Sequence, residues 1–388
     1  MLRSVRRAGA VAGLLALAAV TAFGGAATAA PAKLKSPSQA MAAVAKGGSG
    51  GSGELRVVAE GLNNPRGIGI GPDGALYVAE SGKGGAGPCI AGPEGDQACF
   101  GRSGSVTRIT RNSQQRVLTG LPSTAAPDGT AAAGPVDLGF SGWTGYLLIG
   151  NPGGGAATRK ALGPGAGRFG KLLKVDLHGI RSVADFPRFE DANNPDGGDP
   201  AEGGVDSNPN GLLVRHGARY VTDAGGNDLL KVDHKGRISV VAVFPPRPVG
   251  DIPMQAVPTS VVKGPDGAFY VGQLTGFPFP VGGANVWRVV PGHDPEVFKG
   301  GFTNIIDIAF DRRGRLYVLE IATGGLLNAP ADELPVGRLV RVNRDGSTTT
   351  LASEGLNAPG GFVLGHHTAY TTNNSILPGA GQVVKVAI

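Results

Sequence analysis

Short runs of alternating apolar and polar residues, each broken by a tight turn, recur along this chain. In "GIGIGPDGALYVAE", apolar residues alternate with small or polar ones on both sides of Pro72, Asp73 and Gly74. Because these three residues favour tight turns, the pattern predicts a β-hairpin. The same figure returns as "LGFSGWTGYLLIGN", "GLLVRHGARYVTD", "SVVKGPDGAFYVGQ", "DIAFDRRGRLYVLE" and "GFVLGHHTAYTTN".

Two further strand patterns accompany the hairpins. The third strands share an apolar residue, then Lys or Arg, then Val or Ile, as in "KLLKVD" and "RLVRVN". A fourth strand follows only the first five hairpins, and "ELRVVAEGL" at 54–62, ahead of the first hairpin, supplies the sixth. Four-stranded repeats of this kind predict an all-β fold, a six-bladed β-propeller with four-stranded blades. The N-terminal strand is expected to close the last blade and remove its exposed edge.

The repeats place the propeller at residues 54–388, after two segments of different character. Residues 1–29 combine Arg3, Arg6 and Arg7, an apolar run and the small-residue end Ala27-Thr28-Ala29, which predicts a secretory signal peptide; an uncleaved anchor is the alternative. Residues 30–53 are rich in Ala, Lys, Ser and Gly and predict a flexible leader. The blades are expected at about 63–122, 135–189, 208–247, 257–301, 304–353 and 357–388, the last joined by 54–62.

The net charge and its distribution limit the classes of partner that the protein is expected to bind. The net charge is +6, and it falls to +3 when the three arginines of the signal peptide leave. The remaining charges are interspersed, so binding to nucleic acid or to an acidic membrane is not expected. We therefore expect a secreted protein that leaves the membrane after signal cleavage.

Antiparallel blades sort the connections onto two faces. Turns between first and second strands, and between third and fourth strands, are short and share one face, called here the turn face. The other connections share the opposite, loop-rich face and include nearly every long segment. This indicates function, although surface loops also tolerate Gly-rich insertions without any function. We expect this face to bind a small molecule, a glycan or an extracellular protein. Its long segments are 81–102, 123–134, 152–169, 190–207, 274–283 and 321–336.

The two cysteines and six histidines constrain the chemistry. Cys89 and Cys99 lie in one long segment, and in an exported protein they predict a disulfide rather than a metal site. All six histidines fall in turn-face segments, so no histidine relay, histidine base or histidine-bound metal is expected at the loop-rich face. They are His178, His216, His234, His293, His366 and His367.

Oxygen-bearing side chains remain as candidates, in two aligned sets. One set ends the second strands and offers a ring of acceptors for ligand binding, although polar residues also end buried strands for structural reasons. This strand-end set comprises Glu80, Asn151, Asp223, Gln273, Glu320 and Asn373.

The other set opens the first strands, nearest the channel axis. Its polar members are Arg66, Asp137, Asn210, Thr259, Ser260 and Asp307. Asp137, Asn210 and Asp307 have ligand types suited to Ca²⁺, the only cofactor the residues suggest, and a carboxylate here is also a candidate base. Arg66 argues against both, because a guanidinium would neutralise these acids. Elsewhere, the acid-rich segment 191–211 resembles a calcium loop only loosely, since Pro195 occupies a ligand position.

Several phrases carry a resemblance to a known family. "GLNNPRGIGIGPDGALYVAESGKGG", the paired-cysteine segment ending "CFGRSGSVTRI", and "DSNPNGLL" resemble the ScyD/ScyE family of exported β-propeller proteins, over about residues 54–388. The resemblance implies the fold and export, and hardly any activity. "PNGLL" and "IIDIAFDRRGRLYV" are more distantly similar to gluconolactonase-like and NHL-type propellers, which implies divalent-cation binding by Asn210 and Asp307. Arg66 stands where such proteins carry an acid.

Two functions from different classes therefore stay open. The first is a non-catalytic exported propeller that binds a ligand over the loop-rich face. The second is a metal-dependent, lactonase-like hydrolase that uses Asp137, Asn210 and Asp307. A quinone-dependent sugar dehydrogenase is disfavoured because the loop-rich face offers no histidine.

Overall fold

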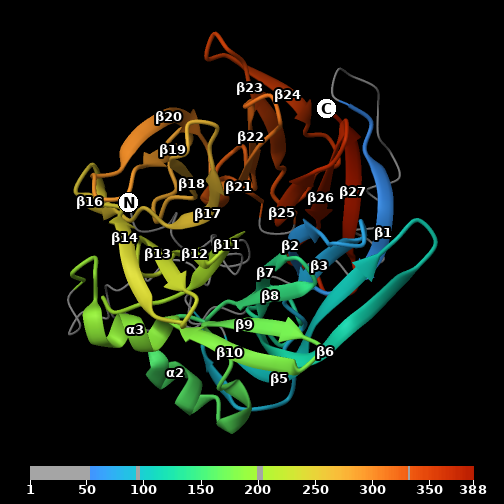
Figure 1. Ribbon diagram of the computed structural model, residues 1–388, viewed down its shortest axis with the longest axis vertical. Helices are drawn as coiled ribbons and strands as arrows, with labels where there is room; N and C mark the ends of the chain where they lie inside the picture. The colour runs from blue at the N-terminus through green and yellow to red at the C-terminus, as the bar shows by residue number, and fades with distance from the viewer. Residues whose placement is uncertain (1–52, 93–96, 199–203, 331–332) are drawn as a thin grey trace.

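The fold is a six-bladed β-propeller. The computed structural model describes residues 53–388 except 93–96, 199–203 and 331–332, so the predicted signal peptide and nearly all of the leader lie outside the described residues. Within the described residues, six antiparallel sheets surround a central axis (Figure 1). This arrangement confirms the fold predicted from the repeats.

Each blade has four main strands, ordered from the channel outward. Blade 1 contains β2 (Pro65–Ile70), β3 (Leu76–Glu80), β5 (Gln97–Ile109) and β6 (Gln114–Ala125), and β4 (Cys89–Ala91) adds to its edge. Blade 2 contains β7 (Pro135–Ser141), β8 (Thr144–Ile149), β9 (Lys171–Asp176) and β10 (Gly179–Asp185). Blade 3 contains β11 (Pro209–Arg215), β12 (Ala218–Asp223), β13 (Asp228–Asp233) and β14 (Ile238–Val243).

The second half of the ring repeats this plan. Blade 4 contains β17 (Pro258–Lys263), β18 (Phe269–Gln273), β19 (Ala284–Val289) and β20 (Glu296–Phe302). Blade 5 contains β21 (Ile305–Phe310), β22 (Leu316–Glu320), β23 (Arg338–Val342) and β24 (Thr348–Ala352). Blade 6 contains β25 (Gly361–Leu364), β26 (Thr368–Asn373) and β27 (Gly381–Ala387), and β1 (Arg56–Leu62) completes it.

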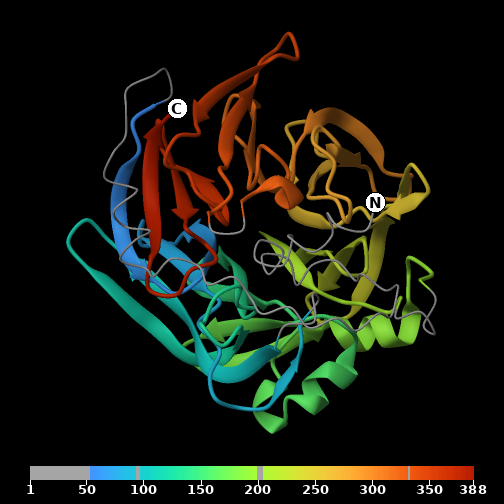
Figure 2. The same ribbon diagram turned by 180° about the vertical axis from the view of Figure 1, so that it is seen from behind.

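The chain closes its own ring. β1 pairs antiparallel with β27, with Arg56 opposite Lys385 and Val57 opposite Val384, and the two strands lie side by side in Figures 1 and 2. Hydrogen bonds therefore tie the first strand of the fold to the last. The predicted closure by the N-terminal strand is confirmed.

Apolar side chains pack between neighbouring blades. In blade 2, Leu147, Leu148 and Ile149 are consecutive and all buried, because this middle strand has a neighbouring blade on each of its faces. Leu148 packs in one cluster with Leu230 of blade 3, whereas Leu147 belongs to a cluster that reaches blade 1. Middle strands thus read as continuous apolar runs rather than as alternating ones.

Short helices and an extra hairpin lie within the connections of the loop-rich face. They are α2 (Ala156–Ala161), η3 (Pro164–Ala166), α3 (Phe186–Asn193), η5 (Leu326–Asn328) and the hairpin of β15 (Arg247–Val249) with β16 (Ile252–Met254). α3 begins where Asp185 accepts a hydrogen bond from the backbone N–H of Arg188, a standard N-cap. The blade repeats did not predict these elements.

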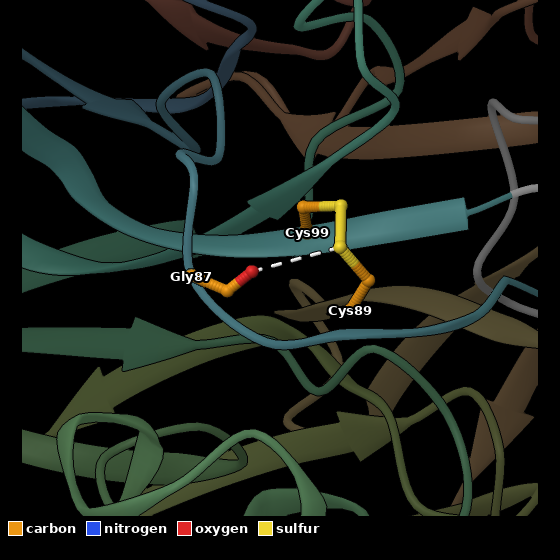
Figure 3. The surroundings of a disulfide bond; sticks show 3 residues. All are labelled: Gly87, Cys89 and Cys99. Atoms are coloured by element: carbon orange, nitrogen blue, oxygen red, sulfur yellow. Dashed lines mark hydrogen bonds between the residues drawn. A yellow bond between two sulfur atoms is a disulfide. The ribbon is translucent and has the colours of Figure 1, made fainter.

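The two cysteines form the predicted disulfide. Cys89 and Cys99 lie opposite each other on the paired strands β4 and β5, and their sulfur atoms are bonded (Figure 3). Sγ of Cys89 also lies 3.6 Å from the carbonyl oxygen of Gly87. A disulfide is typical of an oxidising compartment. Among the described residues, no helix has the length and apolar character needed to cross a membrane.

Candidate functional site: the channel pocket

A pocket of about 60 Å³ opens where the first strands begin, at the loop-rich end of the channel. This volume has room for a few water molecules or a small polar molecule. All six members of the predicted channel set line it. They are Arg66, Asp137, Asn210, Thr259, Ser260 and Asp307. Ser81 and Asn208 add further polar side chains, and the rest of the wall is formed by residues 131–134, Val136, Gly150 and Ile306 with Gly67, Gly360 and Gly361. We call this site the channel pocket.

Asp137 bridges two blades. Its Oδ1 accepts a hydrogen bond of 2.7 Å from the backbone N–H of Leu138, and its Oδ2 accepts one of 2.7 Å from the N–H of Leu212 in blade 3. The side chain also contacts Gly67 of blade 1 at a position where a Cβ atom would collide with it. Glycine in blade 1 therefore makes room for the carboxylate.

Asp307 repeats this arrangement on the other side of the ring. Its Oδ1 accepts a hydrogen bond of 2.8 Å from the N–H of Ile308, and its Oδ2 accepts one of 2.9 Å from the N–H of Phe362 in blade 6. The inner strands of adjacent blades need such partners because their backbones do not pair across the blade boundary. Both aspartates thus hold neighbouring blades together.

Burial changes the charge of both aspartates. Desolvation first, and the Asp307 carboxylate second, raise the pKa of Asp137 to about 8. Desolvation raises the pKa of Asp307 to about 7, although two backbone N–H groups oppose the shift. Near neutral pH, the two carboxyl groups are therefore largely or partly protonated and carry less than their full negative charge.

Arg66 supplies the positive charge of the pocket. Its guanidinium donates a hydrogen bond of 3.0 Å to the carbonyl oxygen of Ala132. Desolvation lowers the pKa of Arg66 to about 10, so the side chain stays protonated at neutral pH. The described residues provide no ion pair to Arg66, and most of its donors are available to a ligand.

The remaining members of the channel set are neutral. Thr259 donates to the carbonyl oxygen of Ile305 over 2.9 Å and so links blades 4 and 5. The hydroxyl of Ser260 is buried without a hydrogen-bond partner among the described residues. Ser260 therefore has unused hydrogen-bonding capacity at the pocket, and Asn210 is a further neutral side chain that lines it.

The strand-end set lies elsewhere. All six side chains are almost completely buried inside their own blades, with at most 2% of their surface exposed, and none lines the channel pocket. Their contacts are with neighbouring backbone and side chains. Ligand binding by these residues stays a prediction, and their observed contacts are structural. The set is Glu80, Asn151, Asp223, Gln273, Glu320 and Asn373.

Four of these side chains share one contact. Each accepts a hydrogen bond from the backbone N–H of the segment that leads into the first strand of the same blade. Glu320, for example, accepts 2.8 Å from the N–H of Thr303 and 2.6 Å from Nε of Arg338. The strand-end carboxylate or amide thus fixes how the chain enters these four blades. The other three pairs are Glu80 with Asn63, Asp223 with Asn208, and Asn373 with Asn357.

The predicted metal ligands share a pocket but not a ready-made metal site. Asp137, Asn210 and Asp307 all line the channel pocket. Among the described residues, no group of three or more His, Cys, Asp or Glu side chains has an arrangement that could hold a metal ion. Calcium binding by these three residues stays a prediction.

Sequence reasoning missed two parts of the wall. Ser81, whose hydroxyl donates 2.9 Å to the carbonyl oxygen of Pro135, follows the strand-end residue of blade 1. Residues 131–134 belong to a segment that the sequence marked only as a long loop. The signal for both was the loop-rich face itself, since loops that connect blades must pass the mouth of the channel.

The comparisons with known proteins show the fold. Neither a protein-family model nor a curated protein matches the chain. A solved protein of unknown function from Bacteroides thetaiotaomicron superposes with a TM-score of 0.52 at 9% identity, covering 86% of this chain and 76% of that one. Virginiamycin B lyase from Staphylococcus aureus gives 0.44 at 13%, covering 86% and 100%. The aldose sugar dehydrogenase of Streptomyces coelicolor gives 0.46 at 12%, covering 88% and 99%.

These likenesses are too distant in sequence to show more than a β-propeller. The ScyD/ScyE resemblance therefore stays a prediction from the motifs.

Proposed function

We propose that this protein is an exported propeller of the ScyD/ScyE type that binds a small polar molecule, or the polar end of a glycan, in the channel pocket without covalent chemistry. One observation carries the proposal: five blades contribute polar side chains to one pocket, and some of these groups have unused hydrogen-bonding capacity. Ligand sites typically combine a concave shape with a few such convergent polar groups. The Cys89–Cys99 disulfide supports export.

The charges of the pocket indicate the class of ligand. Arg66 is protonated, while burial weakens the negative charge of Asp137 and Asp307. A ligand with hydroxyl groups and one carboxylate fits this combination, because its carboxylate pairs with the guanidinium and its hydroxyls reach Ser260 and Asn210. Sugar acids and hydroxy acids have this chemistry.

A thermal-shift screen tests the proposal. We expect a sugar acid or hydroxy acid to raise the unfolding temperature of the purified chain in a saturable way. Arg66→Gln and Asn210→Ala should weaken the response at least tenfold in apparent affinity, since each removes a ligand contact. Arg313→Gln is the matched control, because Arg313 is exposed in a turn-face hairpin. An unchanged thermal shift in both pocket variants would show that the ligand binds outside the channel pocket.

A calcium-dependent, lactonase-like hydrolase is the second candidate. It is supported by the shared location of Asp137, Asn210 and Asp307 in the channel pocket. We prefer binding, because both oxygens of each aspartate already accept backbone N–H groups. Lactone hydrolysis that requires Ca²⁺ and is lost in Asp307→Asn would establish the enzyme; absence of turnover with saturable ligand binding would establish the binding protein.

A further inference from the structure

A second group of carboxyl side chains lies outside the channel pocket, where the end of α3 meets the start of β13. Glu190 belongs to the last turn of α3, and Asp228 is the first residue of β13. Neither residue lines the channel pocket. Both come from blade 3 and the connection that leads into it, on the loop-rich face.

Glu190 and Asp228 are buried without partners. Glu190 is 1% exposed and Asp228 is 0% exposed, and none of their four carboxyl oxygens has a hydrogen-bond partner among the described residues. Buried polar groups are nearly always paired, and two orphaned carboxyl groups are a severe exception. The buried Oδ1 of Asn194, four residues after Glu190, is orphaned as well.

The two orphaned side chains belong to one packed region. The segment after α3 is fixed to the start of β13 by a hydrogen bond of 2.9 Å from Nδ2 of Asn227 to Oδ2 of Asp196. Oε2 of Glu190 lies so close to Gly226 that a Cβ there would stand 3.0 Å from it. The carboxyl group of Glu190 therefore reaches the turn that leads directly into Asp228.

The surrounding acids accept hydrogen bonds from backbone N–H groups and neutral side chains, not from cations. Asp223, directly opposite Asp228 on β12, accepts hydrogen bonds from the N–H groups of Asn208, Gly225 and Gly226. Oδ1 of Asp206 accepts one of 2.5 Å from the N–H of Gly154. Among the described residues, no ion pair involves Glu190, Asp196, Asp206, Asp223 or Asp228.

Burial and the neighbouring acids disfavour the ionised form of both carboxyl groups. Desolvation first, and then Asp223 and neighbouring acids, raise the pKa of Glu190 to about 8. Desolvation, followed by repulsion from Asp223 and Glu190, raises the pKa of Asp228 well above its ordinary value. A bound cation would supply the partner that these buried oxygens lack and would favour their ionised form.

We propose that Glu190 and Asp228, together with the amide oxygen of Asn194, bind one Ca²⁺ ion at the entrance of blade 3. Ca²⁺ takes six to eight oxygen ligands and accepts carboxylate, amide and backbone carbonyl oxygens together with water. Two carboxylates and one amide fit this pattern, with water completing the set, since the described residues offer no group of three or more His, Cys, Asp or Glu that could hold a metal ion. Mg²⁺ is disfavoured, because it demands octahedral geometry and keeps its water. The site is independent of the channel pocket.

Calcium titration of the chelator-treated full chain tests the proposal. We expect calorimetry to give one Ca²⁺ per chain, and we expect Ca²⁺ to raise the unfolding temperature more than Mg²⁺ at equal concentration. Amide hydrogen exchange should slow at 186–198 and 224–229, which needs no variant. Binding without slowed exchange there, or no binding at millimolar Ca²⁺, would overturn the proposal.

Isosteric variants assign the ligands. Glu190→Gln and Asp228→Asn should each weaken Ca²⁺ binding at least tenfold, and without Ca²⁺ they should unfold at the same temperature as the parent or higher, since burial already disfavours the charged form that the amides cannot adopt. Glu354→Gln and Asp294→Asn are the matched controls, because both acids are exposed. Asp307→Asn should keep the full calcium response. Full binding in the first two variants with loss in Asp307→Asn would place the ion in the channel instead.

Discussion

The close approach of blades 1 and 2 at Gly67 gives the sharpest prediction. An ideal Cβ on this residue would lie 2.8 Å from the carbonyl oxygen of Val136 and 2.9 Å from Cα of Asp137, and it would also collide with Oδ1 of Asp137. Carbon contacts are optimal at about 3.5–4.0 Å, so Gly67→Ala forces the two strands apart. Backbone, not a flexible side chain, must move.

The expected cost follows from two contributions. Overpacking of a well-fitted contact costs about 1–3 kcal/mol. Displacing Asp137 also weakens its hydrogen bond to Leu212, and a hydrogen bond to a charged group contributes about 1.5–3 kcal/mol. Because burial leaves Asp137 largely protonated, we take the lower part of that range and expect a total loss of about 2–4 kcal/mol.

Urea unfolding, followed by tryptophan fluorescence and circular dichroism, measures this loss. Gly145→Ala is the matched control, since Gly145 also lies in a strand of this region and its Cβ would meet nothing closer than 3.7 Å. That variant should be neutral or slightly more stable, because alanine reduces the freedom of the unfolded chain. Equal stability of the two variants would refute the close-packing argument for the channel wall.

Three further predictions concern the ring and its edges. A chain lacking residues 54–62 loses β1, so we expect lower stability and more aggregation by light scattering than in a chain starting at Gly53. Glu320→Gln weakens the buried contact with Arg338 and should lower the free energy of unfolding, measured in urea, by about 1–3 kcal/mol. An unchanged free energy would show that Glu320 does not stabilise the blade entrance. Hydrogen bonds from the Arg237 backbone N–H and the Arg237 side chain lower the pKa of Asp233 to about 2. The Asp233 carboxylate therefore contributes to the free energy of unfolding above about pH 4, and this contribution fades as the pH falls. Asp233→Asn should therefore be destabilising at pH 7, and its deficit should shrink toward pH 2 in thermal unfolding.

The repeats made the ring predictable from sequence. Each hairpin carries its own turn residues, such as Pro72-Asp73-Gly74, and these local signals need no tertiary information. The closure by β1 was also accessible, because only five of the six repeats carry their own fourth strand. The channel set followed from topology, since the first strands of all blades begin at the same end of the channel.

Other features depend on tertiary contacts that the sequence does not reveal. The strand-end acids looked like a collar of ligand oxygens, yet Glu320 and Glu80 face backbone N–H groups and arginines within their own blades. α3 was missed because its eight residues lie in a segment rich in Asn, Asp and Gly, where tertiary packing of Phe186 decides the helix. Propensity alone is weak at this length.

Raised carboxyl pKa values do not separate structural from binding acids in this protein, whereas hydrogen-bond partners do. Asp137 and Glu190 both have a pKa near 8 because both are desolvated. Both oxygens of Asp137 accept backbone N–H groups from two blades, so its burial is explained by the fold. Neither carboxyl oxygen of Glu190 accepts a hydrogen bond among the described residues, and the same holds for both carboxyl oxygens of Asp228. A cation would supply the interaction that these two buried carboxyl groups lack, which is why we place the proposed calcium site at blade 3 rather than in the channel.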